Sequence, residues 1–241
     1  MSRLHLAALL AAGTLALAGC AGAAETPAPA AAGSSSTPAP TTAKPALAAA
    51  DAGKAVADAA KQATAVHVKG AVSDEGAITL DLQLNKDSAS GKVVKDGVEI
   101  PVLRVGEKYY FRFSESLVKE AGIPASAGKL LVGKWIPSTS KLGEGIADAF
   151  KMFLDYKTFT DNTVGELAQS TFTGGEPTTV GGVSALNFKS TEGTATVVAD
   201  APHYLLRLQD PKKGAMEFSD WNKATTVNPP PAKEIYSGPG A

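Results

Sequence analysis

The stretch GAITLDLQLN, residues 76–85, is the clearest β-strand in the sequence. Its large apolar side chains fall at every second position, and threonine, aspartate or glutamine stands between them. A period of two is typical of a strand that has one dry face and one wet face. The residues expected on the dry face are Ile78, Leu80, Leu82 and Leu84.

Short stretches with strand character lie on both sides of residues 76–85 and are separated by turn residues. Asp96-Gly97 and Val105-Gly106-Glu107 have the composition of hairpin turns. In the last stretch, Tyr109, Phe111 and Phe113 alternate and are expected to share one face. Strands joined in this way predict an antiparallel meander. Its strands are expected at residues 66–73, 76–85, 90–97, 98–106 and 107–114.

Helical patterns come before and after this meander. Residues 47–65 are rich in alanine with small apolar residues at helical spacing, and residues 114–124 form a short helix with Ser114 as its N-cap. Residues 128–138 are compatible with either helix or strand. The most apolar helix is expected at residues 142–159. Its apolar stripe contains Ile146, Ala149, Phe150, Phe153 and Leu154.

A second group of strands follows, with glycine, aspartate and proline at the turns. Separate runs of strands and helices, rather than a strict alternation of the two, predict the α+β class: an antiparallel sheet with helices on one face. The second group of strands is expected at residues 178–190, 193–201, 202–210 and 214–222.

The N-terminus has the organisation of a bacterial lipoprotein signal peptide. Arg3 precedes an apolar run from Leu6 to Leu17, which is too short for a membrane-spanning helix. The run ends in Leu17-Ala18-Gly19-Cys20, which matches the lipobox, and Cys20 is the only cysteine of the chain. We therefore expect cleavage before Cys20, a thioether-linked diacylglycerol on its sulfur and a fatty acid such as palmitate on its amino group. The alternative, an incidental cysteine after an ordinary signal peptide, is much weaker.

Composition divides the chain into four segments. Residues 1–19 are the expected signal peptide, and residues 20–46 contain Cys20 and an Ala/Pro/Ser/Thr linker that has too few large apolar residues to form a core. Residues 47–227 form the expected folded domain. Residues 228–241 contain Pro229-Pro230-Pro231 and are expected to be a flexible tail. The expected location is the extracytoplasmic face of the cell membrane.

Several function classes are disfavoured. A net charge of −1, with 23 basic and 24 acidic residues, gives no basic surface for nucleic acid. The segment 128–135 has the spacing of a phosphate-binding loop but carries Trp135 at the position of the magnesium-binding hydroxyl. Glu144, Asp148 and Asp155 are better explained as a solvated helix face than as catalytic carboxylates. The sequence thus predicts no catalytic site, no metal site and no cofactor.

Three short motifs carry a resemblance to a known family: Phe218-Ser219-Asp220-Trp221, Thr226-Val227-Asn228-Pro229-Pro230 and the turn Gly181-Gly182-Val183. With the lipobox, the linker and the order of the elements, the chain from about residue 46 to 230 resembles the LppX/LprG-type lipoproteins of actinobacteria and, more distantly, the lipoprotein carriers LolA and LolB. This resemblance implies an open, strongly curved antiparallel β half-barrel with helices across its concave face. It also implies an apolar cavity for acylated lipids or glycolipids.

Two functional hypotheses follow. The first is a membrane-anchored lipoprotein that binds a lipid or glycolipid and carries or presents it at the cell envelope, with an envelope transport partner that the sequence does not identify. The second is a non-catalytic sensor or scaffold with a filled core that acts through protein contacts. Alternation alone does not distinguish a filled interior from an open one. The candidate cavity-lining residues are Ile78, Leu80, Leu82, Leu84, Tyr109, Phe111, Phe113, Phe150, Phe153 and Leu154.

Overall fold

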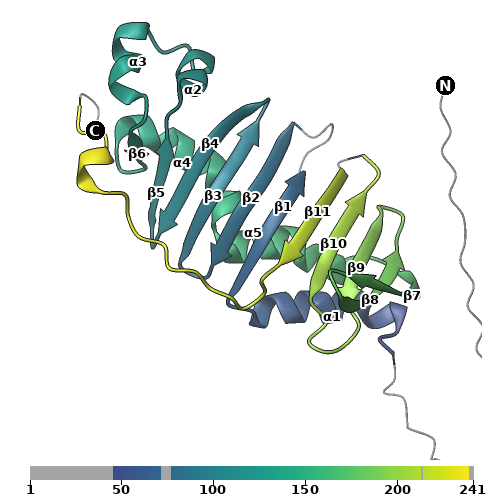
Figure 1. Ribbon diagram of the computed structural model, residues 1–241. Helices are drawn as coiled ribbons and strands as arrows, with labels where there is room; N and C mark the ends of the chain where they lie inside the picture. Colours follow the sequence, from purple (N-terminus) through teal and green to yellow (C-terminus); the bar gives the residue numbers. More distant parts are fainter. Residues whose placement is uncertain (1–45, 72–76, 213, 239–241) are drawn as a thin grey trace, which may run out of the picture. The chain divides into compact units, whose positions relative to one another are not determined.

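The computed structural model describes residues 46–71, 77–212 and 214–238. Eleven strands form one antiparallel sheet that does not close into a barrel, in the order β6-β5-β4-β3-β2-β1-β11-β10-β9-β8-β7 (Figure 1). The sheet therefore consists of two meanders joined where β1 pairs with β11. The strands are β1 Ala65–Ala71, β2 Ile78–Asn85, β3 Ser88–Lys95, β4 Val98–Val105, β5 Lys108–Arg112, β6 Trp135–Pro137, β7 Thr173–Val180, β8 Val183–Lys189, β9 Thr194–Val198, β10 Leu205–Asp210 and β11 Gly214–Ser219.

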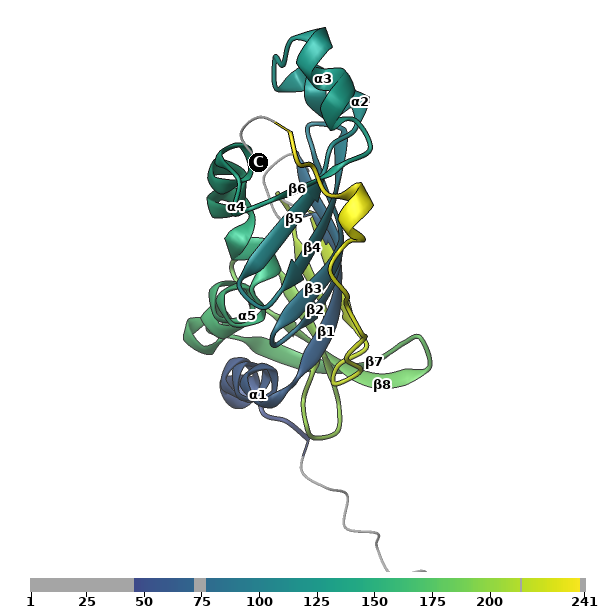
Figure 2. The same ribbon diagram turned by 90° about the vertical axis from the view of Figure 1, so that its left-hand side faces the viewer.

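Three helices cover one face of this sheet. Figure 2 shows α1 (Ala49–Gln62), α4 (Lys141–Leu154) and α5 (Tyr156–Thr163) on the same side of the strands. Two shorter helices, α2 (Glu115–Glu120) and α3 (Ala125–Leu131), extend beyond the end of the first meander. The described residues thus have the predicted architecture, an α+β fold with an open, curved antiparallel sheet and helices across its concave face.

Local sequence explains the hairpins of the first meander. Asp96 and Gly97 both have positive φ, 50° and 81°, as a tight turn between β3 and β4 requires. Gly91 in the middle of β3 has φ 143°, and a Cβ atom there would lie 2.1 Å from the carbonyl oxygen of Asp81 on the neighbouring strand. Such close backbone approach at a glycine is one way in which a sheet is bent.

The helix expected at residues 142–159 is two helices. Asp155 lies between α4 and α5 with extended backbone angles, φ −89° and ψ 115°. Its carboxylate accepts hydrogen bonds from the backbone N–H and the hydroxyl of Thr158, both at 2.8 Å, which makes it the N-cap of α5. The apolar pattern continues across the junction, so it did not reveal the break. The ambiguous residues 128–138 contribute to both α3 and β6.

The chain after β11, including residues 228–238 of the expected tail, makes hydrogen bonds to other parts of the fold. After β11 the chain runs past the ends of the first-meander strands towards β6, on the side of the sheet away from the covering helices (Figures 1 and 2). Thr225 exchanges two hydrogen bonds with the side chain of Asn85, and Tyr236 donates its N–H to the Trp135 carbonyl at 2.9 Å. A short helix, η3 (Ala232–Glu234), precedes this contact. We call this segment, residues 220–238, the strap. Proline lacks a backbone N–H donor, but Pro229, Pro230 and Pro231 do not prevent the strap from packing against the sheet.

Candidate functional site

A pocket lies between the helix layer and the second meander. It encloses about 1160 Å³ and is half open to solvent. Its walls come from the end of α4, from α5, from the short helix η2 (Gly165–Gln169) and from the turn between β8 and β9. Its floor is formed by β9, β10 and β11. The pocket is therefore built mainly from segments that follow the first meander in the chain.

The pocket has an apolar part and a polar rim. Apolar side chains from both layers meet in it: Met152, Phe153, Phe159, Phe172, Leu208 and Met216. The rim is rich in neutral hydroxyl and amide groups, with the charged residues Glu166, Lys189, Glu192 and Asp210. Such a surface suits an amphipathic molecule whose apolar part enters and whose polar part remains near water.

The inner face of the second meander explains why space remains there. Ala195 on β9 and Gly214 on β11 place little or no side-chain volume over the floor. In the first meander, by contrast, Phe111 on β5 is fully buried and its ring centroid lies 5.4 Å from that of Phe150 on α4. The second meander also buries large side chains, Phe188, Leu205 and Phe218, so the open space is confined to the part of its inner face around Ala195 and Gly214.

Only Phe153 of the predicted lining residues belongs to this pocket, where it lies 6.4 Å from Phe150 measured between ring centroids. The other nine candidates lie outside the pocket, in or against the packed core, so their prediction as lining is corrected for this pocket. The physical reason is that α4 packs against β3, β5 and β6 and fills the space over the first meander. These core residues are Ile78, Leu80, Leu82, Leu84, Tyr109, Phe111, Phe113, Phe150 and Leu154.

The sequence interpretation missed the floor of the pocket. Leu208 is flanked by Arg207 and Gln209, but the adjacent Leu205 and Leu206 and a register shift between β9 and β10 make the alternation of β10 less regular than that of β2. Met216 in β11 lies between Ala215 and Glu217. The additional signal was the small size of Ala195 and Gly214 on the neighbouring strands, because small side chains leave the space between the sheet and the helices less filled. Cys20, the predicted lipidation site, lies outside the described residues.

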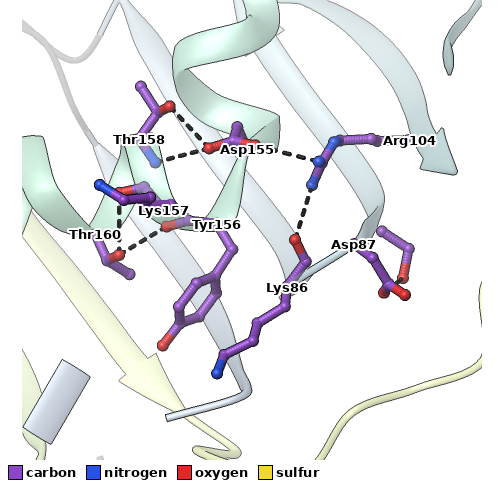
Figure 3. Close-up of polar contacts among 9 residues, drawn as sticks. Lys86, Asp87, Arg104, Asp155, Tyr156, Lys157, Thr158 and Thr160 are labelled. Carbon is purple, nitrogen blue, oxygen red and sulfur yellow. Dashed lines mark hydrogen bonds and ion pairs between the residues drawn. The ribbon is translucent and has the colours of Figure 1, made fainter. Parts of the chain in front are cut away.

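A polar cluster beside the pocket joins the helix layer to the sheet (Figure 3). Arg104 on β4 is 5% exposed, and its Nη2 atom lies 3.2 Å from the carboxylate of Asp155. Its Nη1 atom donates to the carbonyl of Lys86 at 3.3 Å, whereas its buried Nε has no partner among the described residues. A charge on the inner face of a sheet is costly unless it is paired, so this ion pair is a specific connection between β4 and the α4–α5 junction.

Asp155 is held in its charged form by this cluster. Burial opposes ionisation of the carboxyl group, but the two hydrogen bonds from Thr158 and the positive charge of Arg104 outweigh it and lower the pKa below its ordinary value of 3.8. The interpretation of Asp155 as part of a solvated acidic face is therefore wrong, although Glu144 and Asp148 are exposed as expected.

The neighbouring Tyr156 ties α5 to α1. It is 3% exposed, and its hydroxyl donates to the carbonyl of Ala60 at 2.7 Å. Burial raises the pKa of the phenol above its ordinary value, because a phenolate in this position would be poorly solvated. Helices α4, α5 and α1 are thus connected to one another, and Arg104 connects them to the sheet.

The fold belongs to the class of α+β proteins with an open, curved antiparallel sheet. LprF from Mycobacterium bovis has a similar fold, with a TM-score of 0.51, 13% sequence identity and coverage of 76% of this chain and 96% of LprF. The Mycobacterium tuberculosis lipoprotein LppX matches with a TM-score of 0.46, 16% identity and coverage of 75% and 98%. MucB, solved in complex with MucA, matches with a TM-score of 0.32, 14% identity and coverage of 80% and 60%.

The predicted resemblance to the LppX/LprG type of lipoprotein is thereby confirmed at the level of the fold. No protein-family model and no curated protein matches the sequence. Within the described residues, no helix has the length and hydropathy needed to cross a membrane.

Proposed function

We propose that this chain is an extracytoplasmic lipoprotein, anchored in the cell membrane through Cys20, that binds the acyl chains of a lipid or glycolipid and carries or presents them at the cell envelope. The observation that carries the proposal is the large, half-open pocket with apolar walls between α5 and β9–β11. The LprF-like fold agrees with a lipoprotein of this architecture.

The size and chemistry of the pocket support acyl binding. Its volume of about 1160 Å³ is at or above the range of about 300–1,000 Å³ that is usual for small-molecule sites. Each buried CH₂ group contributes about 0.8 kcal/mol, so a long acyl chain supplies enough transfer free energy for tight binding without a specific polar motif. No bond needs to be formed or broken, because the pocket only replaces the bilayer as the surroundings of the chain.

The expected anchor and the domain have separate roles in this proposal. The acyl groups on Cys20 hold the protein on the membrane, and residues 21–46 allow the domain of residues 47–227 to move above the surface. The Cys20→Ser variant, prepared without residues 1–19 so that the apolar run Leu6–Leu17 is absent, is expected to appear in the aqueous fraction after Triton X-114 partitioning, whereas the wild-type protein enters the detergent phase. Equal partitioning of both proteins would contradict the anchor but leave the lipid pocket open to its own test.

The pocket is tested by identifying what it contains. Protein purified from its native membrane, extracted under denaturing conditions and analysed by mass spectrometry, is expected to release lipid in near-stoichiometric amount. The Leu208→Trp variant places an indole in the pocket and should abolish this lipid. Arg207→Trp is the matched control, since Arg207 is on the same strand but exposed and outside the pocket. Lipid-free wild-type protein, or equal loading of the two variants, would refute the proposal.

The sensor or scaffold hypothesis has one observation in its favour. A second groove of about 900 Å³, lined by polar residues such as His67, Arg207 and Glu217, lies beside the β7–β8 turn, where Val180 and Val183 are exposed. A protein that acts only through this surface would carry no lipid and would tolerate Leu208→Trp. The lipid analysis described above therefore also decides between the two hypotheses.

A further inference from the structure

Arg104 occupies a position that the strand pattern assigns to the core. Ile100, Val102 and Arg104 alternate along β4, and all three side chains are buried. The guanidinium group reaches the α4–α5 junction through Asp155 and the β2–β3 turn through the Lys86 carbonyl. An apolar residue would fill this space without the cost of burying a charge, so the pair is expected to specify a geometry rather than to add stability.

The partner of Arg104 is the only residue between two helices. Asp155 ends α4, where its N–H donates to the Lys151 carbonyl at 3.0 Å, and its side chain begins α5 through Thr158. A single extended residue is a point at which the two helix axes can change direction. The ion pair with Arg104 fixes this point relative to β4 (Figure 3).

The pocket wall lies on both sides of this junction. Met152 and Phe153 precede Asp155, whereas Phe159 and Asn162 follow it, and all four line the pocket. A change in the angle between α4 and α5 would move one pair relative to the other. The width and depth of the apolar part therefore depend on the direction in which the junction is held.

We propose that Arg104 and Asp155 are positioning residues of the acyl-binding pocket, which hold α4 and α5 at the angle that sets its depth and hence its preference for acyl-chain length. This inference rests on the proposed function. Neither residue contacts the ligand, and both act through the placement of Phe153 and Phe159.

The first test removes the ion pair and keeps the fold. Arg104→Met removes the positive charge and keeps an unbranched side chain that can fill the buried space. Asp155→Asn removes the negative charge and keeps a good N-cap for α5. Val93→Ala is the control, since it truncates a buried core residue on β3 that is not part of the pocket. The probes are dansyl-labelled dodecanoic and octadecanoic acids, titrated against full-length protein that carries Cys20→Ser.

The wild-type protein is expected to bind the longer probe more tightly. Both ion-pair variants should reduce the ratio of the two affinities by at least about threefold, which is within the usual range for coupled residues. Val93→Ala should lower thermal stability without changing this ratio of affinities. Arg104→Lys keeps the positive charge, so it should retain more of the preference for the longer probe than Arg104→Met does. A wild-type ratio in both ion-pair variants, or an equal change in Val93→Ala, would overturn the assignment.

A second readout does not depend on lipid. Spin labels at Met152→Cys and Asn162→Cys, both exposed positions, report the distance across the junction by double electron–electron resonance. The distribution should broaden or shift with Arg104→Met and Asp155→Asn but not with Val93→Ala. If the wild-type protein binds neither fatty acid, the proposed function fails, and the distance between the two spin labels alone decides whether Arg104 and Asp155 position α4 and α5. An unchanged distance in Arg104→Met and Asp155→Asn refutes that positioning role.

Discussion

Replacement of Leu82 and of Leu208 by alanine separates the packed half of the fold from the pocket half. Leu82 on β2 has no exposed surface and lies in the core cluster. Truncation of such a leucine costs about 2–5 kcal/mol, because the transfer free energy of the side chain is lost and a cavity remains. At roughly 2–4 °C per kcal/mol for a domain of this size, the melting temperature should fall by about 4–20 °C.

Leu208 gives the opposite pattern. It is only partly buried and faces the open pocket, so its truncation removes roughly half of a full leucine burial, about 1 kcal/mol. Its loss should nevertheless weaken binding of a dansyl-labelled fatty acid, because it removes part of the apolar floor. Leu82→Ala, measured in the same way below its melting temperature, should leave that affinity within about a factor of two, as expected for a site without shared partners.

The assays are thermal unfolding followed by circular dichroism and fluorescence titration with the fatty acid. The reasoning would be refuted if Leu82→Ala reduced affinity as strongly as Leu208→Ala does. That result would mean that the ligand enters the first meander, as the alternation of β2 suggests, and that the packed core rearranges to admit it.

Three further predictions concern stability. Tyr156→Phe leaves the Ala60 carbonyl without its buried donor and should lower the free energy of unfolding in urea by about 1–3 kcal/mol. Gly91→Ala should destabilise the protein by more than about 2 kcal/mol in the same assay, because its Cβ would collide with the Asp81 carbonyl oxygen at positive φ; a neutral effect would show that β3 is free to shift. The pKa of Asp155 is lowered in the folded state, so the ionised carboxylate stabilises the folded protein fully above a pH of about 4. This contribution is lost as the pH falls through the lower pKa of the folded state. The difference in the free energy of unfolding between the wild-type protein and Asp155→Asn should therefore be constant from about pH 8 to 5 and decrease only in stronger acid.

The secondary structure was predictable because its causes are local. Alternation in GAITLDLQLN specifies β2, Asp96-Gly97 specifies the turn between β3 and β4, and the Ser114 hydroxyl accepts a hydrogen bond from the Leu117 N–H, as its position before α2 suggests. The order of strands and helices then indicates the α+β class. Each of these features depends on neighbours within a few residues of the chain.

The location of the pocket was not predictable in this way, because it depends on where the helix layer ends over the sheet. Leu82 and Leu208 are both apolar residues flanked by polar ones in a strand, but α4 covers the first meander and leaves the floor near Leu208 accessible. The packing of the chain after β11 is a similar case. Its contacts join Asn85 to Thr225 and Trp135 to Tyr236, pairs that are distant in sequence and have no local pattern.

One long-range feature does leave a trace in the sequence. Ile100, Val102 and Arg104 continue the inward alternation of β4, so the strand period by itself places a charge on the inner face. A buried arginine needs a carboxylate partner, and the structure supplies Asp155 from the α4–α5 junction. The alternation of β4 therefore predicts that a charge is buried, whereas its partner has no local signal, because the spacing of Asp155 from Glu144 and Asp148 is that of a solvated helix face. The ion pair adds a directional contact to the apolar packing of Phe150 against Phe111, because the guanidinium and carboxylate groups pair only when the α4–α5 junction lies over β4.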